Sequence, residues 1–172
     1  MRTGGKSNPS PHRFSNQKMY CTMDKSKAID ILNDLITKNY DGENGYKEAA
    51  EDVDSPTLKT MFTDYARQRY DFGHELKDAI RQAGGEVEKG GSVAAAIHRT
   101  WIDLKSAIAG NDEAAVLEEA KRGEENALKE YDEALSQLNS TDPGYSVVSK
   151  QRTQIQQALS QIEQQLSVYA GN

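Results

Sequence analysis

Charged side chains interrupt the apolar stripes of three segments that have helical spacing. Glu43 follows Ile36 by seven positions and precedes Tyr46 by three, so it shares their helix face. The same arithmetic places Arg69 and Glu124 on the apolar faces of two later segments. Because a buried charge is costly unless it is paired, we expect these side chains to meet one another inside the fold.

A histidine belongs to the same group. His98 lies three positions before Trp101, at the edge of the apolar stripe of a fourth segment. With a rise of about 1.5 Å per residue, Glu43, Arg69, His98 and Glu124 all fall near the middle of their helices. The spacing therefore predicts one polar layer at mid-height of a helical bundle.

Two glutamates and one histidine are also ligands for a divalent metal. In carboxylate-bridged di-iron bundles, two helices each supply a Glu and the other two each supply a Glu-x-x-His pair. Asp71 and His74 have that spacing, but they lie about 140–160° from the apolar face of their helix. The corresponding motif at Glu119 has Arg122 in place of histidine, so the full di-iron ligand set is absent.

Two interpretations of the polar layer stay open. In the first, Glu43, Arg69 and Glu124 form a structural ion network, with His98 hydrogen-bonded at its edge. Arg69 favours this interpretation, since its fixed positive charge takes the electrostatic role of a metal. In the second, Glu43, His98 and Glu124 bind iron or another divalent metal, in a redox or stress role. A catalytic acid–base role is a weaker third interpretation, because no nucleophile or oxyanion device accompanies these residues.

Five segments carry the helical apolar pattern. The first runs from Lys25 to Val53, the second from Ser55-Pro56 to Gly84-Gly85, the third from Ser92 to Gly110, the fourth from Asn111 to Leu138, and the last follows the turn Asp142-Pro143-Gly144. The links from the first to the second and from the third to the fourth are short, so each pair is an antiparallel hairpin. We therefore expect an all-α fold, a four-helix bundle with an additional C-terminal fifth helix.

The expected organisation has three parts. Residues 1–23 are polar and aperiodic, which predicts a disordered N-terminal extension. Residues 24–139 form the four-helix bundle, and residues 140–172 form a C-terminal helix packed on the bundle or extending from it. This last helix is rich in glutamine and has a narrow apolar stripe, so a homo-oligomer or partner contact through it is the alternative.

Composition excludes several classes of function. The 172 residues include 27 acidic and 21 basic side chains, a net charge of −6 that argues against a general nucleic-acid binder. No apolar run approaches the ~18 residues of a membrane helix, and the first residues have no apolar stretch typical of a signal peptide. One cysteine fits a reducing compartment. The sequence contains no glycine-rich phosphate loop, no Cys-x-x-Cys and no His-Glu-x-x-His motif. These absences favour a non-enzymatic protein.

Several blocks of the sequence resemble a bacterial family of four-helix-bundle proteins, a domain of unknown function in the ferritin-like superfamily. The blocks are residues 41–53, 69–76, 98–101 with Leu104-Lys105, and 122–125. The resemblance covers roughly residues 25–166 and implies a cytoplasmic protein with a ferritin-like bundle, hence a crossover link between the second and third helices. It supplies no characterised catalytic residues. Ferritins carry six metal ligands, whereas this chain matches two glutamates and one histidine.

Overall fold

Helices make up the regular structure of the part of the chain that is described. The computed structural model describes residues 12–88 and 112–170, and the side chains of residues 25–88 and 112–169. It contains α1 (His12–Asp52), α2 (Pro56–Gln82), α5 (Glu113–Gln137) and α6 (Tyr145–Ala170), and no strand within these ranges. The predicted all-α fold is thus confirmed for the described residues. The third predicted helix, which carries His98, lies outside them, and the ferritin-like arrangement and the fifth helix stay predictions.

Local sequence explains where two of the helices begin. The side chain of Ser55 accepts a hydrogen bond from the amide of Leu58 (3.4 Å), and Pro56 occupies the first helical position of α2. At the start of α5 the cap is Asp112, whose side chain accepts a hydrogen bond from the amide of Ala115 (3.1 Å). Asp112 thus provides an acceptor for an amide of the first turn that has no partner within the helix. It also places a negative charge at the helix N-terminus.

The turn between α5 and α6 depends on a glycine. Gly144 has a φ of +80°, a conformation that residues with a Cβ adopt only with strain. A Cβ at this position would also lie 2.7 Å from both methyl carbons of Leu32 on α1. The turn therefore lies directly against α1, at the end of the bundle.

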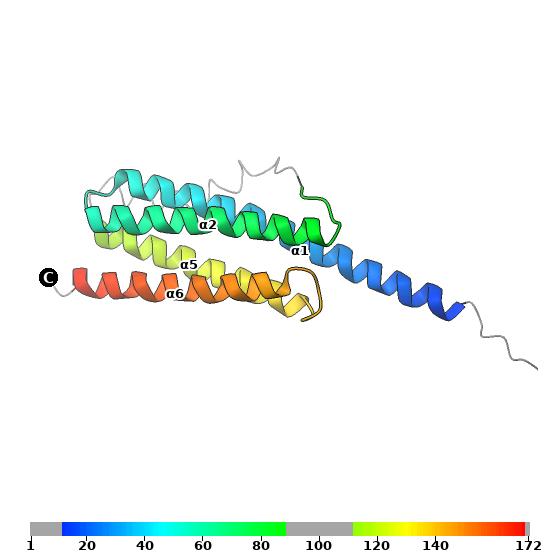
Figure 1. Cartoon of the computed structure of the whole chain (residues 1–172). Helices are drawn as coiled ribbons and strands as arrows, with labels where there is room; N and C mark the ends of the chain where they lie inside the picture. The colour runs from blue at the N-terminus through cyan, green and yellow to red at the C-terminus, as the bar shows by residue number, and fades with distance from the viewer. Residues whose placement is uncertain (1–11, 89–111, 171–172) are drawn as a thin grey trace, which may run out of the picture.

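The four helices form a bundle in which each neighbouring pair is antiparallel. The neighbours are α1 and α2, α5 and α6, α1 and α5, and α2 and α6. Figure 1 shows α1 and α2 as one hairpin, with the hairpin of α5 and α6 beside it. The two diagonal pairs, α1 with α6 and α2 with α5, run parallel. A hydrogen bond from the amide of Ser55 to the carboxylate of Glu113 (2.7 Å) joins the starts of α2 and α5 and fixes this direction.

Because α2 and α5 run parallel, the end of α2 and the start of α5 lie at opposite ends of the bundle (Figure 1). The third predicted helix, between them in the sequence, lies outside the described residues. The crossover link that the resemblance implied therefore stays a prediction.

Helix α1 is longer than its apolar stripe. It has 41 residues, about 60 Å at 1.5 Å per residue, and its N-terminal end projects beyond the other helices (Figure 1). It begins at His12, inside the segment for which the sequence predicts a disordered extension. The sequence gives no signal for this start, because helical periodicity is visible only where one face is apolar.

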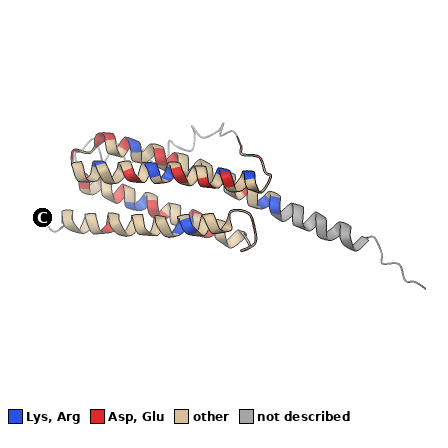
Figure 2. Ribbon diagram, in the orientation of Figure 1, with Lys and Arg blue, Asp and Glu red and all other residues tan. Residues whose placement is uncertain are grey.

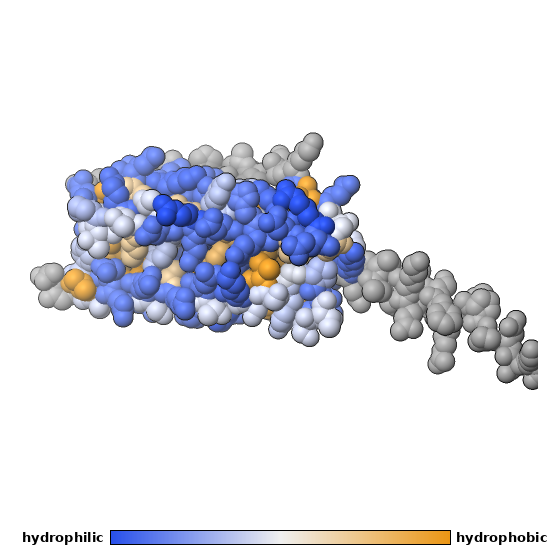
Figure 3. Space-filling model, viewed as in Figure 1, coloured by the Kyte–Doolittle hydropathy of each residue, from blue (hydrophilic) through white to orange (hydrophobic). Residues whose placement is uncertain are grey.

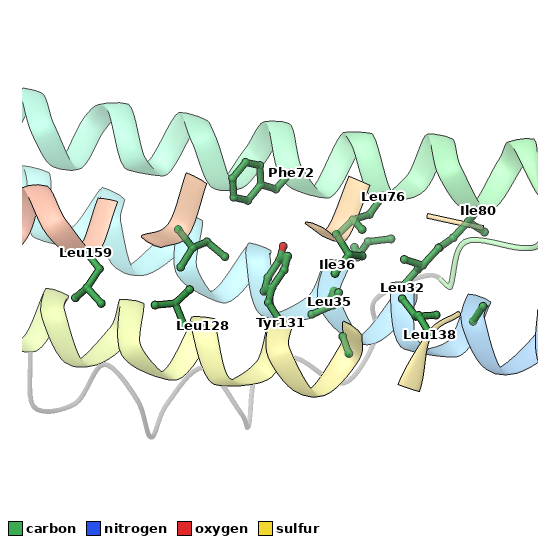
Figure 4. Packing of buried hydrophobic residues seen from close by; sticks show 14 residues of the cluster. Leu32, Leu35, Ile36, Phe72, Leu76, Ile80, Leu128, Tyr131, Leu138 and Leu159 are labelled. Atoms are coloured by element: carbon green, nitrogen blue, oxygen red, sulfur yellow. The ribbon is translucent and has the colours of Figure 1, made fainter. Parts of the chain in front are cut away.

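The apolar core consists of two clusters. The first contains Leu32, Ile36, Leu76 and Tyr131 among others, and Figure 4 shows these side chains converging from α1, α2 and α5. The second lies nearer the turn between α1 and α2 and is built around residues such as Phe62. In the described part of the chain, six polar side chains are also buried: Asn33, Asn39, Glu43, Arg69, Glu124 and Gln151.

Helix α6 supplies one side of this core. Val148, Ile155 and Ile162 are fully buried, and they belong to the narrow stripe that the sequence left open for a partner. Only three charged residues lie on this helix, fewer than on the others (Figure 2). The apolar stripe is thus used inside the chain, and an oligomer formed through α6 would need other residues, such as the exposed Val168.

The face drawn in Figure 3 is mainly hydrophilic, with scattered apolar residues. None of the described helices is both long and apolar enough to cross a membrane.

Candidate functional site

A buried ion pair lies at the centre of the bundle. Nη2 of Arg69 on α2 lies 2.5 Å from each carboxylate oxygen of Glu124 on α5. Only 4% of Arg69 and 1% of Glu124 are exposed. The guanidinium also lies 5.6 Å from the centre of the Phe72 ring. Since α2 and α5 are diagonal partners, this pair ties the two hairpins together through the interior.

A tyrosine completes the environment of Glu124. The hydroxyl of Tyr46 on α1 donates to Oε1 of Glu124, and its ring packs against Phe62 and Tyr65 at centroid distances of 5.9 and 5.4 Å. Burial and the charge of Glu124 hold the pKa of Tyr46 well above its usual range, so the hydroxyl stays a donor. Burial alone would lower the pKa of Arg69, but Glu124 more than offsets this and raises it. Sequence reasoning treated Tyr46 as an apolar core residue and missed this contact.

Glu43 is buried but does not join the pair. Its carboxylate accepts from Nζ of Lys47, one turn further along α1, at 2.5 Å. Among the described residues it makes no hydrogen bond or ion pair with Arg69 or Glu124. It lines a separate hollow between α1 and α2, together with Lys59 and Arg67 among others. The inward position indicated by spacing is present, since Glu43 is 7% exposed, but the expected three-residue network is not.

A second buried polar chain connects all four helices. Nδ2 of Asn39 donates to the hydroxyl of Tyr131 (2.8 Å), which donates to Oε1 of Gln151 (2.8 Å). Nε2 of Gln151 in turn donates to the carbonyl of Phe72 (3.2 Å) and to Glu75 (2.9 Å). Burial raises the pKa of Tyr131 to about 12. The sequence showed no signal for this chain, because asparagine, glutamine and tyrosine at helical spacing are common at core edges.

A polar cavity of about 360 Å³ lies between α1 and α5. Its inner wall includes Tyr46, Arg69, Glu124 and Tyr131, and Gly42 forms part of the same wall. A Cβ at residue 42 would lie 3.4 Å from Cγ of Arg69, an ordinary van der Waals contact with the arginine stem. At Gly73 an added Cβ would meet nothing within 4 Å.

One carboxylate of this cavity has an altered acidity. Partial burial and the nearby charge of Glu130 raise the pKa of Asp41 to about 6, and Lys38 acts in the opposite direction. Lys38 itself pairs with Glu130 across the cavity (2.5 Å). Asp41 is therefore near the midpoint of its titration in mildly acidic solution.

The described residues do not fit a carboxylate metal site. Both oxygens of Glu124 already accept from Arg69, and Glu43 faces a different hollow. Among the side chains of residues 25–88 and 112–169, no group of three or more His, Cys, Asp or Glu is arranged to hold a metal ion. The third ligand of the predicted set, His98, lies outside the described residues. The metal site of Glu43, His98 and Glu124 stays a prediction.

Comparison with known proteins identifies the family. Residues 27–137 match the family model of a domain of unknown function, DUF2383, and the chain belongs to this family. The match ends at the last residue of α5, so α6 follows the family domain. No curated protein matches the chain.

Proposed function

We propose that the chain, as a member of this family of unknown function, is a non-enzymatic helical-bundle protein whose polar layer is structural. The observation that carries the proposal is the contact of one Arg69 nitrogen with both oxygens of Glu124 in the bundle centre. A guanidinium in that position takes the place that a metal ion would need between carboxylates. The polar layer holds the two hairpins in register. The protein then acts through contacts made by its surface or its last helix.

The state of the buried groups also argues against acid–base catalysis. Both oxygens of Glu124 already accept from Arg69, and Tyr46 donates to one of them, so the carboxylate is not open to a substrate. The raised pKa of Tyr46 keeps its hydroxyl protonated at neutral pH. A general base needs a lone pair that a substrate can reach, and neither buried group of this cluster offers one.

Iron loading tests the proposal. The full chain is loaded with ferrous iron under anaerobic conditions and desalted, and the iron retained per chain is measured. The test variant is Glu43→Gln, because it removes a predicted metal ligand without disturbing the Arg69–Glu124 pair. Glu51→Gln, an exposed position on the same helix, is the matched control.

The two functions give opposite results. For a structural layer, wild type and both variants retain no stoichiometric iron. Retention of about one or two irons per chain, as in a carboxylate-bridged site, that is lost in Glu43→Gln but kept in Glu51→Gln would replace the proposal with metal binding. In that case oxygen consumption would be measured next.

A further inference from the structure

The cavity between α1 and α5 contains two oxygen atoms without hydrogen-bond partners. They are Oδ1 of Asn39 and Oδ1 of Asp41, both of them buried atoms of residues that line this cavity. Asn39 is only 2% exposed. A buried acceptor that lacks a donor costs about 1–3 kcal/mol, so a partner for these oxygens is expected.

The orientation of the Asn39 amide is determined by its neighbours. Its Nδ2 donates to the carbonyl oxygen of Leu35 (2.7 Å), one helical turn earlier, and to the hydroxyl of Tyr131. The carbonyl of Leu35 is an acceptor only, so turning the amide over would place two acceptors against each other. The free atom of Asn39 is therefore the oxygen, and the group missing from the cavity is a donor.

The charges of the cavity favour a positive ligand. Two of its ion pairs are internally satisfied, Lys38 with Glu130 and Arg69 with Glu124. The remaining charged side chains of the wall are two carboxylates, Asp41 and Glu133, and one amine, Lys129. An anion would have to compete with Glu124 for Arg69, whereas a cation finds unsatisfied acceptors.

We propose that this cavity binds a small ligand with a primary ammonium group, held by Oδ1 of Asn39 and the carboxylate of Asp41. An ammonium carries three N–H donors and a positive charge, which matches two unpartnered buried oxygens in a cavity whose wall has one more acidic than basic side chain. A cavity of about 360 Å³ has room for a short alkyl chain behind that group. The site does not depend on the structural role proposed for Arg69 and Glu124, since neither of these residues supplies the free oxygens.

The proposal is tested with simple amines as probes. Binding of 1,4-diaminobutane and of ethylammonium to the full chain is measured by titration calorimetry, and the amide resonance of Gly42 reports on the cavity by NMR. Tetramethylammonium has the same charge as ethylammonium but no N–H group, and acetate tests for an anion site. We expect saturable binding of 1,4-diaminobutane at one site with a Kd of about 1 mM or below, competition by ethylammonium, and no effect of the other two.

Two variants with the same change of charge make the test specific. Asp41→Asn removes the carboxylate from the cavity, and Asp71→Asn removes one from the exposed face of α2. We expect Asp41→Asn to weaken diaminobutane binding at least about tenfold, and Asp71→Asn to bind as wild type does. Thermal unfolding of both variants shows whether a loss of binding comes from a loss of folding.

Three results would overturn the proposal. They are an absence of saturable binding at tens of millimolar, equal binding of tetramethylammonium, and unchanged affinity in Asp41→Asn. Each would mean that water alone satisfies Asn39 and Asp41. None of these results bears on iron retention, so this site and the structural role of the polar layer fail independently.

Discussion

The guanidinium of Arg69 and the carboxylate of Glu124 meet across the diagonal of the bundle, with Nη2 2.5 Å from both oxygens. This contact joins α2 and α5, which are not neighbours in the ring of helices. A buried pair of this kind adds little net stability over an apolar replacement, because removing two charges from water is expensive. Its value is specificity, since only one register of the hairpins brings the two charges together.

Single and double substitutions should therefore behave very differently. Glu124→Gln leaves Arg69 buried without a counter-charge, and we expect it to lower the free energy of unfolding by about 3–5 kcal/mol. The double variant Arg69→Met/Glu124→Leu removes both charges and should recover most of that loss. Urea denaturation followed by circular dichroism measures both. If the double variant were as unstable as Glu124→Gln, the ion pair itself would add net stability to the fold, beyond the mutual neutralisation of two buried charges.

Substitution of Glu43 should change the free energy of unfolding far less than substitution of Glu124. Its partner Lys47 is exposed, and the ion pair between them lies one turn apart on the same helix. Pairs of this kind contribute about 0.3–0.5 kcal/mol. We expect Glu43→Gln to change the free energy of unfolding by less than about 1 kcal/mol, measured in the same urea experiment. A loss equal to that of Glu124→Gln would place Glu43 in the central network after all.

The contrast between these glutamates shows how far sequence reasoning reaches. Helical spacing gives the direction of a side chain from the helix axis, and it placed Glu43, Arg69 and Glu124 on inward faces. It does not give the partner, because Glu43 had a lysine within reach on its own helix. The spacing arguments also treated Tyr46 as an apolar core residue and did not single out Asn39, since both residue types fit a core edge as well as a polar contact. Partners depend on how the helices rotate and pair, which only the assembled bundle shows.

The role of the last helix was the larger uncertainty in the sequence. Its glutamine-rich pattern fitted an outer helix as well as an interface, and a narrow stripe does not distinguish the two. The structure buries that stripe against α2 and α5. Direction along the bundle was equally hidden from the sequence, because local signals for caps and turns contain no information about which distant helix becomes a neighbour.

The second polar chain should also contribute to stability. Tyr131→Phe removes the hydroxyl that accepts from Asn39 and donates to Gln151, leaving two buried polar groups without this partner. We expect Tyr131→Phe to lower the free energy of unfolding by about 1–3 kcal/mol. Denaturant titrations of the variant and of wild type measure this difference. Tyr70→Phe, at an exposed position of α2, is the control and should be near neutral. An equally small effect at Tyr131 would mean that water replaces the hydroxyl.

Removal of α6 should disrupt the bundle although the helix lies outside the family domain. A chain that ends at residue 139 loses Val148, Ile155 and Ile162 from the core, together with the buried Gln151. We expect it to lose cooperative thermal unfolding and to be cleaved rapidly by protease, because the apolar faces of α2 and α5 become exposed. Cooperative unfolding with unchanged stability would show instead that residues 27–137 form a self-sufficient bundle.

The acidity of Asp41 gives a pH-dependent prediction. Its pKa is raised from 3.8 to about 6 in the fold, so the folded chain binds the proton more tightly than the unfolded chain does. The stabilising effect of that proton is fully present below pH 4 and is lost as the pH rises through 6. Asp41→Asn should therefore match wild type near pH 4 and exceed it at pH 7 by about 1 kcal/mol, a value reduced by partial exposure of the group. Urea titrations of both proteins from pH 4 to 7.5 measure the difference, and a gap that is constant with pH would mean that Asp41 titrates normally. The same substitution is expected to weaken amine binding at least about tenfold, so the carboxylate of Asp41 would lower the stability of the fold at neutral pH while it contributes to ligand binding.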